Sequence, residues 1–308
     1  MPKSVDVIIP TYHPGKEFRE LVKRLLVQEY PVDHIFIMNT GEEDWDEQIG
    51  MLSDKIVVEH LEKAGFDHGG TRHRAIQKSS ADIVICMTQD AMPKDRSLVG
   101  SLVESFDDTA VKAAYARQLP ARDCGVIECY TREFNYPEQS RIKRKEDLPA
   151  LGIKTYFCSN VCAAYDRKTY LELGGFVRHT IFNEDMIFAA GLIGHGYAVA
   201  YTADARVVHS HNYSGIQQLR RNFDLAVSQA QHPEIFADVP SEGEGIRMVK
   251  QTAGYLLRKR PYLIPKLIWQ SGCKYLGFRL GRRYERLPKG MVMKLTMNRD
   301  YWSRNTKG

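Results

Sequence analysis

The fold is decided by the stretch Val5-Asp6-Val7-Ile8-Ile9-Pro10-Thr11-Tyr12, close to the N-terminus. Its β-branched residues favour extended backbone, and a proline cannot continue the hydrogen-bond ladder of a central strand. We therefore expect a buried strand that ends near Pro10 and opens into a polar loop.

Strands and helices are expected to alternate after this stretch. A helix is predicted over residues 18–26, because Phe18, Leu21, Val22 and Leu25 recur at a spacing of three and four. The alternation predicts an α/β fold with a mostly parallel central sheet, helices on both faces and ligands at the carboxyl ends of the strands. Further strands are expected at residues 34–39, 56–60, 82–87, 112–117, 160–165, 197–201 and 206–209, with an irregular excursion over residues 118–154.

The length and composition suit a folded core with an appended unit. With 308 residues and 43% hydrophobic residues, we expect an α/β domain over residues 1–215 and a helical extension over residues 216–308. No apolar run reaches the roughly 18 residues of a membrane span, and the first residues do not form a signal peptide. We expect a cytoplasmic protein with its six cysteines reduced.

The C-terminal region is strongly basic. Residues 254–308 contain 14 Lys and Arg against two acidic residues. Such a region suits anionic lipid headgroups or nucleic acid; we favour an anionic membrane surface, because no motif for reading nucleic acid is present. A charged helical lid and a contact in a homo-oligomer are the alternatives. The expected membrane anchors are Tyr255, Leu256, Leu257, Tyr262, Leu263, Ile264, Ile268 and Trp269, beside Arg258, Lys259, Arg260 and Lys266.

Polar residues follow the predicted strands and are expected to gather at one edge of the sheet. Each group alone is weak evidence for a functional site, because Asn-Thr-Gly is an ordinary turn and an aspartate after a strand is often a helix cap. Their order along the chain is more informative. The groups are Pro10-Thr11-Tyr12, Asn39-Thr40-Gly41, Thr88-Gln89-Asp90, Glu184-Asp185 and His209-Ser210-His211.

This order resembles family 2 glycosyltransferases of the GT-A (nucleotide-diphospho-sugar transferase) fold, over about residues 5–230. Within that family the chain is similar to bacterial rhamnosyltransferase-like enzymes of cell-surface polysaccharide synthesis. Gly69-Gly70-Thr71-Arg72-His73 looks like the family's Gly…Ala-Arg-Asn helix start. Leu173-Gly174-Gly175-Phe176 followed by Asn183-Glu184-Asp185-Met186 resembles the acceptor-side signature.

The resemblance implies a set of roles. It places Glu184 and Gly175 on the acceptor side, and it makes Asp185 the base that takes the acceptor's proton. Asp90 and His209 are the expected ligands of a divalent cation, Mg²⁺ or Mn²⁺, although Thr88 replaces the first aspartate of the family's Asp-x-Asp motif. The expected donor-binding residues are Pro10, Thr11, Tyr12, Asn39, Thr40, Gly70, Arg72, Gln89 and Asp90.

The expected activity is inverting transfer of a sugar from a nucleotide donor to a hydroxyl. The resemblance favours L-rhamnose from dTDP-β-L-rhamnose and a lipid-linked saccharide acceptor, at the inner face of the cell membrane. The alternatives are a UDP-hexose or UDP-N-acetylhexosamine donor, and a non-catalytic sugar-nucleotide-binding protein. For Asp185 itself the plain alternative is a carboxylate that only complements a helix dipole. The glycosyltransferase interpretation expects the carboxylates of residues 90 and 185 to flank one sugar-sized hollow.

Overall fold

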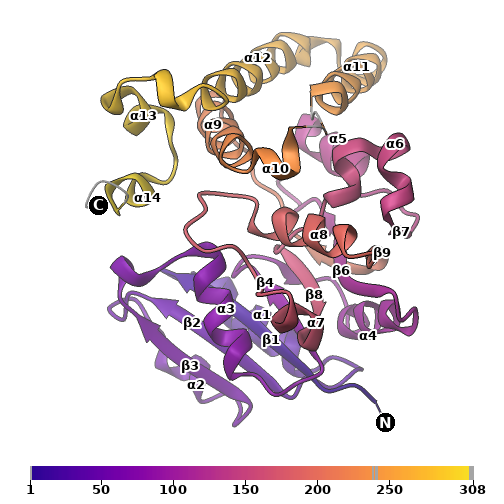
Figure 1. Ribbon diagram of the computed structural model, residues 1–308, viewed down its shortest axis with the longest axis vertical. Helices are drawn as coiled ribbons and strands as arrows, with labels where there is room; N and C mark the ends of the chain where they lie inside the picture. The colour runs from indigo at the N-terminus through magenta and orange to yellow at the C-terminus, as the bar shows by residue number, and fades with distance from the viewer. Residues whose placement is uncertain (1, 238, 240–241, 305–308) are drawn as a thin grey trace. The chain divides into compact units, whose positions relative to one another are not determined.

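The computed structural model describes residues 2–237, 239 and 242–304 (Figure 1). The chain forms two compact units. The first comprises Met1–Ala121, Tyr136–Arg178 and Glu184–Ser210, and the second comprises Arg122–Asn135, His179–Asn183 and His211–Gly308. Each unit therefore combines segments that are distant in sequence, and the domain boundary at residue 215 stays a prediction.

A nine-stranded sheet forms the centre of the first unit, in the order β3-β2-β1-β4-β8-β6-β9-β5, with β7 paired to β9. Neighbouring strands from β3 to β4 are parallel, as are β6 and β9, whereas β8 is antiparallel to both of its neighbours. The strands are β1 (Val5–Tyr12), β2 (His34–Thr40), β3 (Ile56–Leu61), β4 (Ile83–Met87), β5 (Met92–Pro93), β6 (Val111–Leu119), β7 (Arg141–Lys143), β8 (Cys162–Asp166) and β9 (Ala198–Val208).

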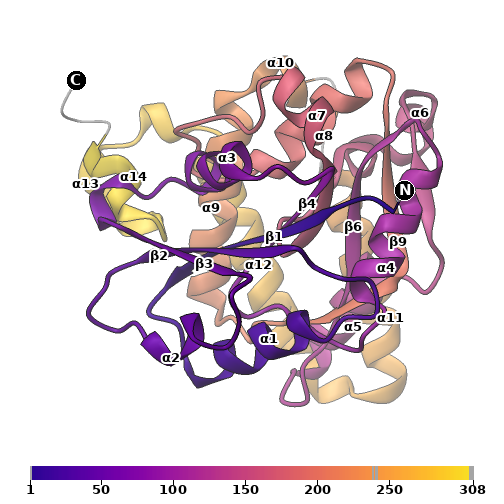
Figure 2. The same cartoon turned by 90° about the horizontal axis from the view of Figure 1, so that it is seen from below.

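Both faces of this sheet are covered. Alternate residues of β1 enter different cores: Val7 and Ile9 pack on one side and Ile8 on the other, as the two-residue period of a strand requires. Figure 2 shows α1 and α2 on one side of β1–β3 and α3 on the other. The predicted α/β fold with a mostly parallel central sheet is confirmed. The helices of the first unit are α1 (Lys16–Leu26), α2 (Glu47–Gly50), α3 (His68–Lys78), α4 (Leu98–Glu104), α6 (Leu148–Leu151), α7 (Arg167–Glu172) and α8 (Glu184–Gly194).

Three local expectations are corrected. Residues 197–201 and 206–209 belong to one strand, β9, whose register shifts by a bulge opposite Ala116 and Arg117. The stretch 118–154 is not irregular, because it contains a helix of the second unit together with β7 and α6. The strand expected at 160–165 begins later, at Cys162, and runs antiparallel to β4.

The second unit is helical. Two small cores hold it together, one around Phe223 and Val227 and the other around Leu256 and Leu267. Two of its long helices, α9 and α12, approach so closely that a Cβ on Gly277 would lie 2.1 Å from the carbonyl oxygen of Leu219. Across the described residues, no helix combines the length and apolar character needed to cross a bilayer. The helices are α5 (Val126–Asn135), α9 (Gly215–Gln231), α10 (Pro233–Phe236), α11 (Glu242–Lys259), α12 (Ile264–Gly281), α13 (Lys289–Leu295) and α14 (Arg299–Arg304).

Candidate active site

The predicted polar groups of the first unit do meet at one edge of the sheet. β1 and β4 are parallel neighbours, so their carboxyl ends lie together. Because β8 is antiparallel to β4, its first residue, Cys162, pairs with the last residue of β4, Met87. The segment that precedes β8 therefore joins the same edge and brings Asn160 into the site.

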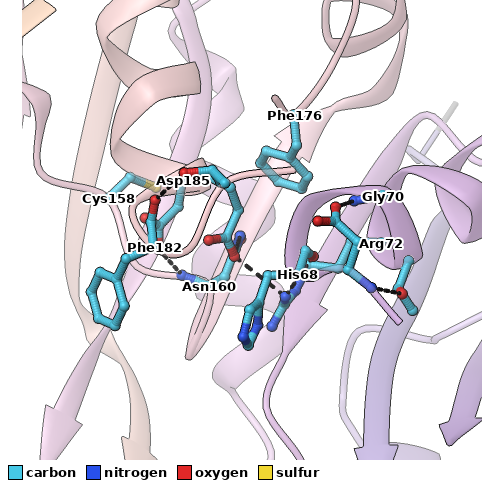
Figure 3. A network of polar contacts seen from close by, with 12 residues as sticks. His68, Gly70, Arg72, Cys158, Asn160, Phe176, Phe182 and Asp185 are labelled. Atoms are coloured by element: carbon cyan, nitrogen blue, oxygen red, sulfur yellow. Dashed lines mark hydrogen bonds and ion pairs between the residues drawn. The ribbon is translucent and has the colours of Figure 1, made fainter. Parts of the chain in front are cut away.

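Asn160 connects this edge to the start of α8 (Figure 3). Its main-chain N–H donates to Asp185 Oδ2 at 2.8 Å, and its side-chain Nδ2 donates to Glu184 Oε1 at 3.2 Å. Its Oδ1 in turn accepts a 2.8 Å hydrogen bond from the hydroxyl of Tyr165. Both carboxylates that open α8 are thus held by one residue of the neighbouring strand segment.

Glu184 is buried and paired with Arg72 of α3. The guanidinium Nη1 lies 3.3 Å from Glu184 Oε1 and also donates to the carbonyl of His68 at 2.9 Å. Burial alone would raise the pKa of Glu184, but the charge of Arg72, helped by His68 and Asn160, lowers the pKa below its ordinary value. Glu184 is therefore a carboxylate that stays ionised inside the unit.

The pKa of Asp185 is shifted in the opposite direction to that of Glu184. Burial, followed by the repulsion of the adjacent Glu184 carboxylate, raises the pKa of Asp185 to about 7. Two main-chain N–H groups, those of Asn160 and Met186, each donate to one of its oxygens at 2.8 Å and fix its orientation. Each carboxylate oxygen has a second lone pair, so Asp185 keeps the capacity to accept a proton near neutral pH.

The ends of β1 and β2 are joined by side chains predicted to bind the donor. Thr11 Oγ1 donates to Asn39 Oδ1 at 2.8 Å, and both residues are buried. The side chain of Gln89 pairs with the main-chain N–H and carbonyl of Tyr12, at 2.8 and 3.0 Å. Thr11, Asn39 and Gln89 thus hold the loop, whereas the Tyr12 ring, 44% exposed, is free of the core. Thr40 contributes a buried hydroxyl without a hydrogen-bond partner among the described residues.

Two residues expected on the donor side also have partners within the unit, and their contact with a donor stays a prediction. The N–H of Gly70 donates to the carboxylate of Asp67, the N-cap of α3, so the start of this helix is closed by its own cap and does not present that N–H to a phosphate. Arg72 is 4% exposed and paired with Glu184, so its positive charge is already balanced inside the unit by this carboxylate. Both residues support the site through contacts inside the unit.

Gly175 also has a structural role that the sequence did not indicate. Its φ is +73°, and a Cβ at this position would lie 2.5 Å from His73 Nδ1 and 2.7 Å from Tyr170 Cζ. Only glycine tolerates both conditions. The predicted acceptor-side glycine is a point of close packing, and any contact with an acceptor stays a prediction.

A candidate metal site lies at the ends of β4 and β9. Asp90 Oδ1 is 3.4 Å from Nδ1 of His209, whose side chain is buried while that of Asp90 is 46% exposed. Within the first unit these two residues supply one carboxylate and one imidazole. An imidazole ligand suits Mn²⁺ better than Mg²⁺. Thr88 is placed beside β8 by a main-chain hydrogen bond to Val161 but offers only a buried hydroxyl.

Asn160 and Lys143 are the site residues that sequence reasoning missed. Lys143 is buried, donates from Nζ to the carbonyls of Lys154 and Phe157, and lies 4.6 Å from the centre of the Tyr115 ring. Burial lowers the pKa of Lys143 to about 7. This lysine braces the segment that leads to Asn160. A polar residue directly before an apolar strand was a signal for Asn160, whereas Lys143 lay in a stretch without a recognisable period.

The sheet order and the acidic start of α8 at its edge define an enzyme of the glycosyltransferase GT-A class. Residues 6–174 match the sequence model of "Glycosyl transferase family 2". The chain is 38% identical to the O-antigen chain rhamnosyltransferase RfbN of Salmonella typhimurium, over 97% of this chain and 96% of that protein. It is 36% identical, with the same coverage, to the O-antigen chain rhamnosyltransferase WbaN of Salmonella anatum.

Solved structures agree with this assignment of the fold. The mannosyltransferase PcManGT of Pyrobaculum calidifontis, in complex with GDP-Man and Mn²⁺, superposes with a TM-score of 0.55 at 16% identity, covering 99% of this chain and 84% of that one. The chain belongs to family 2 of the glycosyltransferases and is a glycosyltransferase.

The buried ion pair between Arg72 and Glu184 leads to a prediction about stability. Arg72→Met leaves the Glu184 carboxylate buried without its cation, and we expect a loss of about 3–5 kcal/mol in the free energy of unfolding at pH 7.5, measured by urea denaturation. Arg74→Met is the matched control on the same helix, because this arginine is 57% exposed and its ion pair with Glu59 contributes at most about 1 kcal/mol. Equal losses in both variants would show that the Arg72 pair does not organise the unit.

Proposed function

We propose that the protein is an inverting rhamnosyltransferase that moves L-rhamnose from dTDP-β-L-rhamnose to a hydroxyl of a lipid-linked saccharide during surface polysaccharide synthesis. The two Salmonella relatives, both named as O-antigen chain rhamnosyltransferases and aligned over nearly the whole chain, support the sugar and the process. The environment of Asp185 carries the mechanism, because this carboxylate is oriented by two N–H groups and has a pKa near neutrality.

Asp185 acts as the general base. The acceptor hydroxyl gives its proton to a carboxylate oxygen of Asp185 while its own oxygen bonds to the anomeric carbon of rhamnose. The bond from that carbon to the β-phosphate breaks, and the nucleoside diphosphate leaves with the electron pair. Attack opposite the leaving group converts the β-linked donor into an α-linked product. Glu184 remains ionised beside Arg72, and this ion pair keeps the adjacent Asp185 in place.

The donor is held at the ends of β1, β2 and β4. The exposed Tyr12 ring offers a flat apolar face to the nucleobase, while Gln89 fixes the backbone that carries it. Asp90 and His209 are the residues that would hold a divalent cation. A bound Mn²⁺ would stabilise the negative charge of the departing diphosphate.

The pH dependence of turnover tests the base. Asp185→Asn should lower kcat by about 10² to 10⁴ with the donor dissociation constant unchanged, because the amide cannot accept the proton. In the wild type, kcat should rise with pH and level off above about 7, where Asp185 is deprotonated. Glu184→Gln removes the neighbouring negative charge and lowers the pKa of Asp185, so this limb should move to lower pH. Both are measured by steady-state kinetics from pH 5 to 9.

Two results would contradict this assignment. One is turnover by Asp185→Asn close to that of the wild type. The other is an acidic limb that stays at the same pH in Glu184→Gln, which would mean that another group titrates.

The donor and the cation are tested together. With purified protein, dTDP-rhamnose should be consumed faster than UDP-glucose or UDP-N-acetylglucosamine, and Mn²⁺ should increase the rate. His209→Ala should weaken Mn²⁺ binding, measured by calorimetry without donor, by about tenfold or more. His195→Ala is the control, since His195 is an exposed histidine of the same unit. Faster use of a UDP sugar would overturn the donor, and equal Mn²⁺ binding in both variants would overturn the metal site.

We further infer that the second unit contacts the inner face of an anionic membrane. Half of the expected anchors pack within the unit instead: Leu256 is fully enclosed, whereas Leu263, Ile264 and Tyr255 are partly buried, and Tyr255 stacks on Tyr130 at 4.7 Å. The remaining anchors are exposed by 60% or more, and they are Leu257, Tyr262, Ile268 and Trp269. They share α11, α12 and the turn between them with exposed basic residues, which are Arg258, Lys259, Arg260 and Lys266. Apolar side chains beside cations suit a surface of anionic lipid.

Vesicle sedimentation tests this contact. The wild type should bind vesicles that contain phosphatidylglycerol, more weakly as salt rises, and should not bind phosphatidylcholine vesicles. Tyr262→Ala/Ile268→Ala should weaken binding about tenfold or more by removing two apolar anchors. Met51→Ala, which removes an exposed apolar side chain from the first unit, should bind as the wild type does. Unchanged binding of the double variant would contradict the proposal, as would a shift from dimer to monomer in that variant, which would assign the surface to a homo-oligomer.

A further inference from the structure

The second unit contains a cavity of its own, with a volume of about 270 Å³. Its walls come from α5, from the segment before α9 and its first turn, and from α12. Most of the lining side chains are polar, and the ones that matter here are Glu128, Gln218, Lys266, Gln270 and Lys274. A water molecule occupies about 30 Å³ of liquid, so the cavity has room for a group much larger than a few waters.

The cavity carries an excess of positive charge. Its carboxylate, Glu128, already pairs with Arg132 at 2.8 Å. Lys266 and Lys274 also line the cavity, and neither has an ion-pair partner within 4.0 Å in the described part of the chain. Lys266 is exposed and Lys274 is more buried, and the positive charge that both add to this lining attracts an anion. The cavity is therefore complementary to a negatively charged group.

Lys274 is the more confined of the two lysines. Burial lowers the pKa of Lys274, and the nearby Glu128 offsets this effect only in part. A cation that is largely removed from water without a close counter-ion is costly to keep. A bound oxyanion would stabilise the charged form of Lys274 and accept a charge-assisted hydrogen bond from it.

Side-chain amides complete the lining. Gln218 is 8% exposed, and its amide makes no hydrogen bond to another described residue although it borders the cavity. Gln270 Nε2 donates to the carbonyl of Tyr213 at 3.2 Å, which fixes that side chain across the cavity. The amide of Gln218 is therefore available to bond to a ligand or to water in the cavity. Amide N–H groups beside two lysines are suitable donors for the oxygens of a phosphate.

We propose that this cavity binds an oxyanion of the phosphate or diphosphate class, carried by the saccharide acceptor. The inference rests on the proposed function for the identity of the carrier, but not for the binding of the anion. The residues assigned to the donor nucleotide and to its contacts belong to the first unit, whereas every residue that lines this cavity belongs to the second. The same chemistry occurs in lipid headgroups, which the test must separate from the acceptor.

Calorimetry with inorganic pyrophosphate tests the site. His211, a candidate metal ligand, also lines the cavity, so the titrations contain EDTA to exclude binding through a metal. Lys274→Met should weaken pyrophosphate binding about tenfold or more, because it removes a charged donor while keeping the length of the side chain. Lys274→Arg should retain binding, and Lys289→Met, which removes an exposed lysine of the same unit, should bind as the wild type does. Lys274→Met should melt no lower than the wild type, since it also removes a poorly compensated cation.

The outcomes separate the site from the proposed function. Absence of pyrophosphate binding, or equal binding in Lys274→Met and Lys289→Met, would overturn the site. In transfer assays, Lys274→Met should raise KM for a phosphate-bearing acceptor and leave KM unchanged for the donor and for a phosphate-free saccharide. Loss of anionic-vesicle binding in Lys274→Met would assign the cavity to lipid phosphate and overturn the acceptor. If the protein binds pyrophosphate through Lys274 but transfers no sugar, the anion site is supported and only the proposed function is contradicted.

Discussion

The buried ion pair between Arg72 and Glu184 is the interaction on which the site depends. It joins two helices whose contacting residues are 112 positions apart, and it lies where the first residues of α8 meet the edge of the sheet. A buried charge without its partner costs several kcal/mol, so neither residue can leave the other at little cost. The pair therefore fixes the start of α8, and with it the position of Asp185.

The same ion pair gives two adjacent carboxylates different pKa values. Arg72 holds Glu184 in the ionised form, and the ionised Glu184 together with burial raises the pKa of Asp185 to about 7. One carboxylate becomes a fixed charge and the other becomes a group that can exchange a proton near neutral pH. Asn160 bonds to both and ties this arrangement to the strand next to β4. Residues that looked alike in sequence thus acquire different chemistry from their surroundings.

The order of polar residues after apolar runs was enough to anticipate the sheet, the family and most of the positions at its edge. Parallel strands place their carboxyl ends together, so Thr11, Asn39 and Asp90 were expected to gather. The antiparallel insertion of β8 was not visible, because a single strand does not show the direction of its neighbour. For that reason Asn160, at the beginning of a strand, escaped notice. The helix cap at Gly70 and the close packing at Gly175 were likewise not visible in the sequence, because both depend on three-dimensional contacts.

What the sequence by itself determined was the α/β fold class, since apolar periodicity is a local property of the chain. The class of enzyme came from the resemblance of its motifs to family 2 glycosyltransferases. The tertiary structure decided which of those residues face a ligand and which face the protein. Leu256 and Leu257 are neighbours of equal hydrophobicity, yet one is fully enclosed and the other is 64% exposed. Charge state, burial and partner are properties of three-dimensional surroundings, because desolvation and Coulomb interaction depend on distance in space and not on distance along the chain.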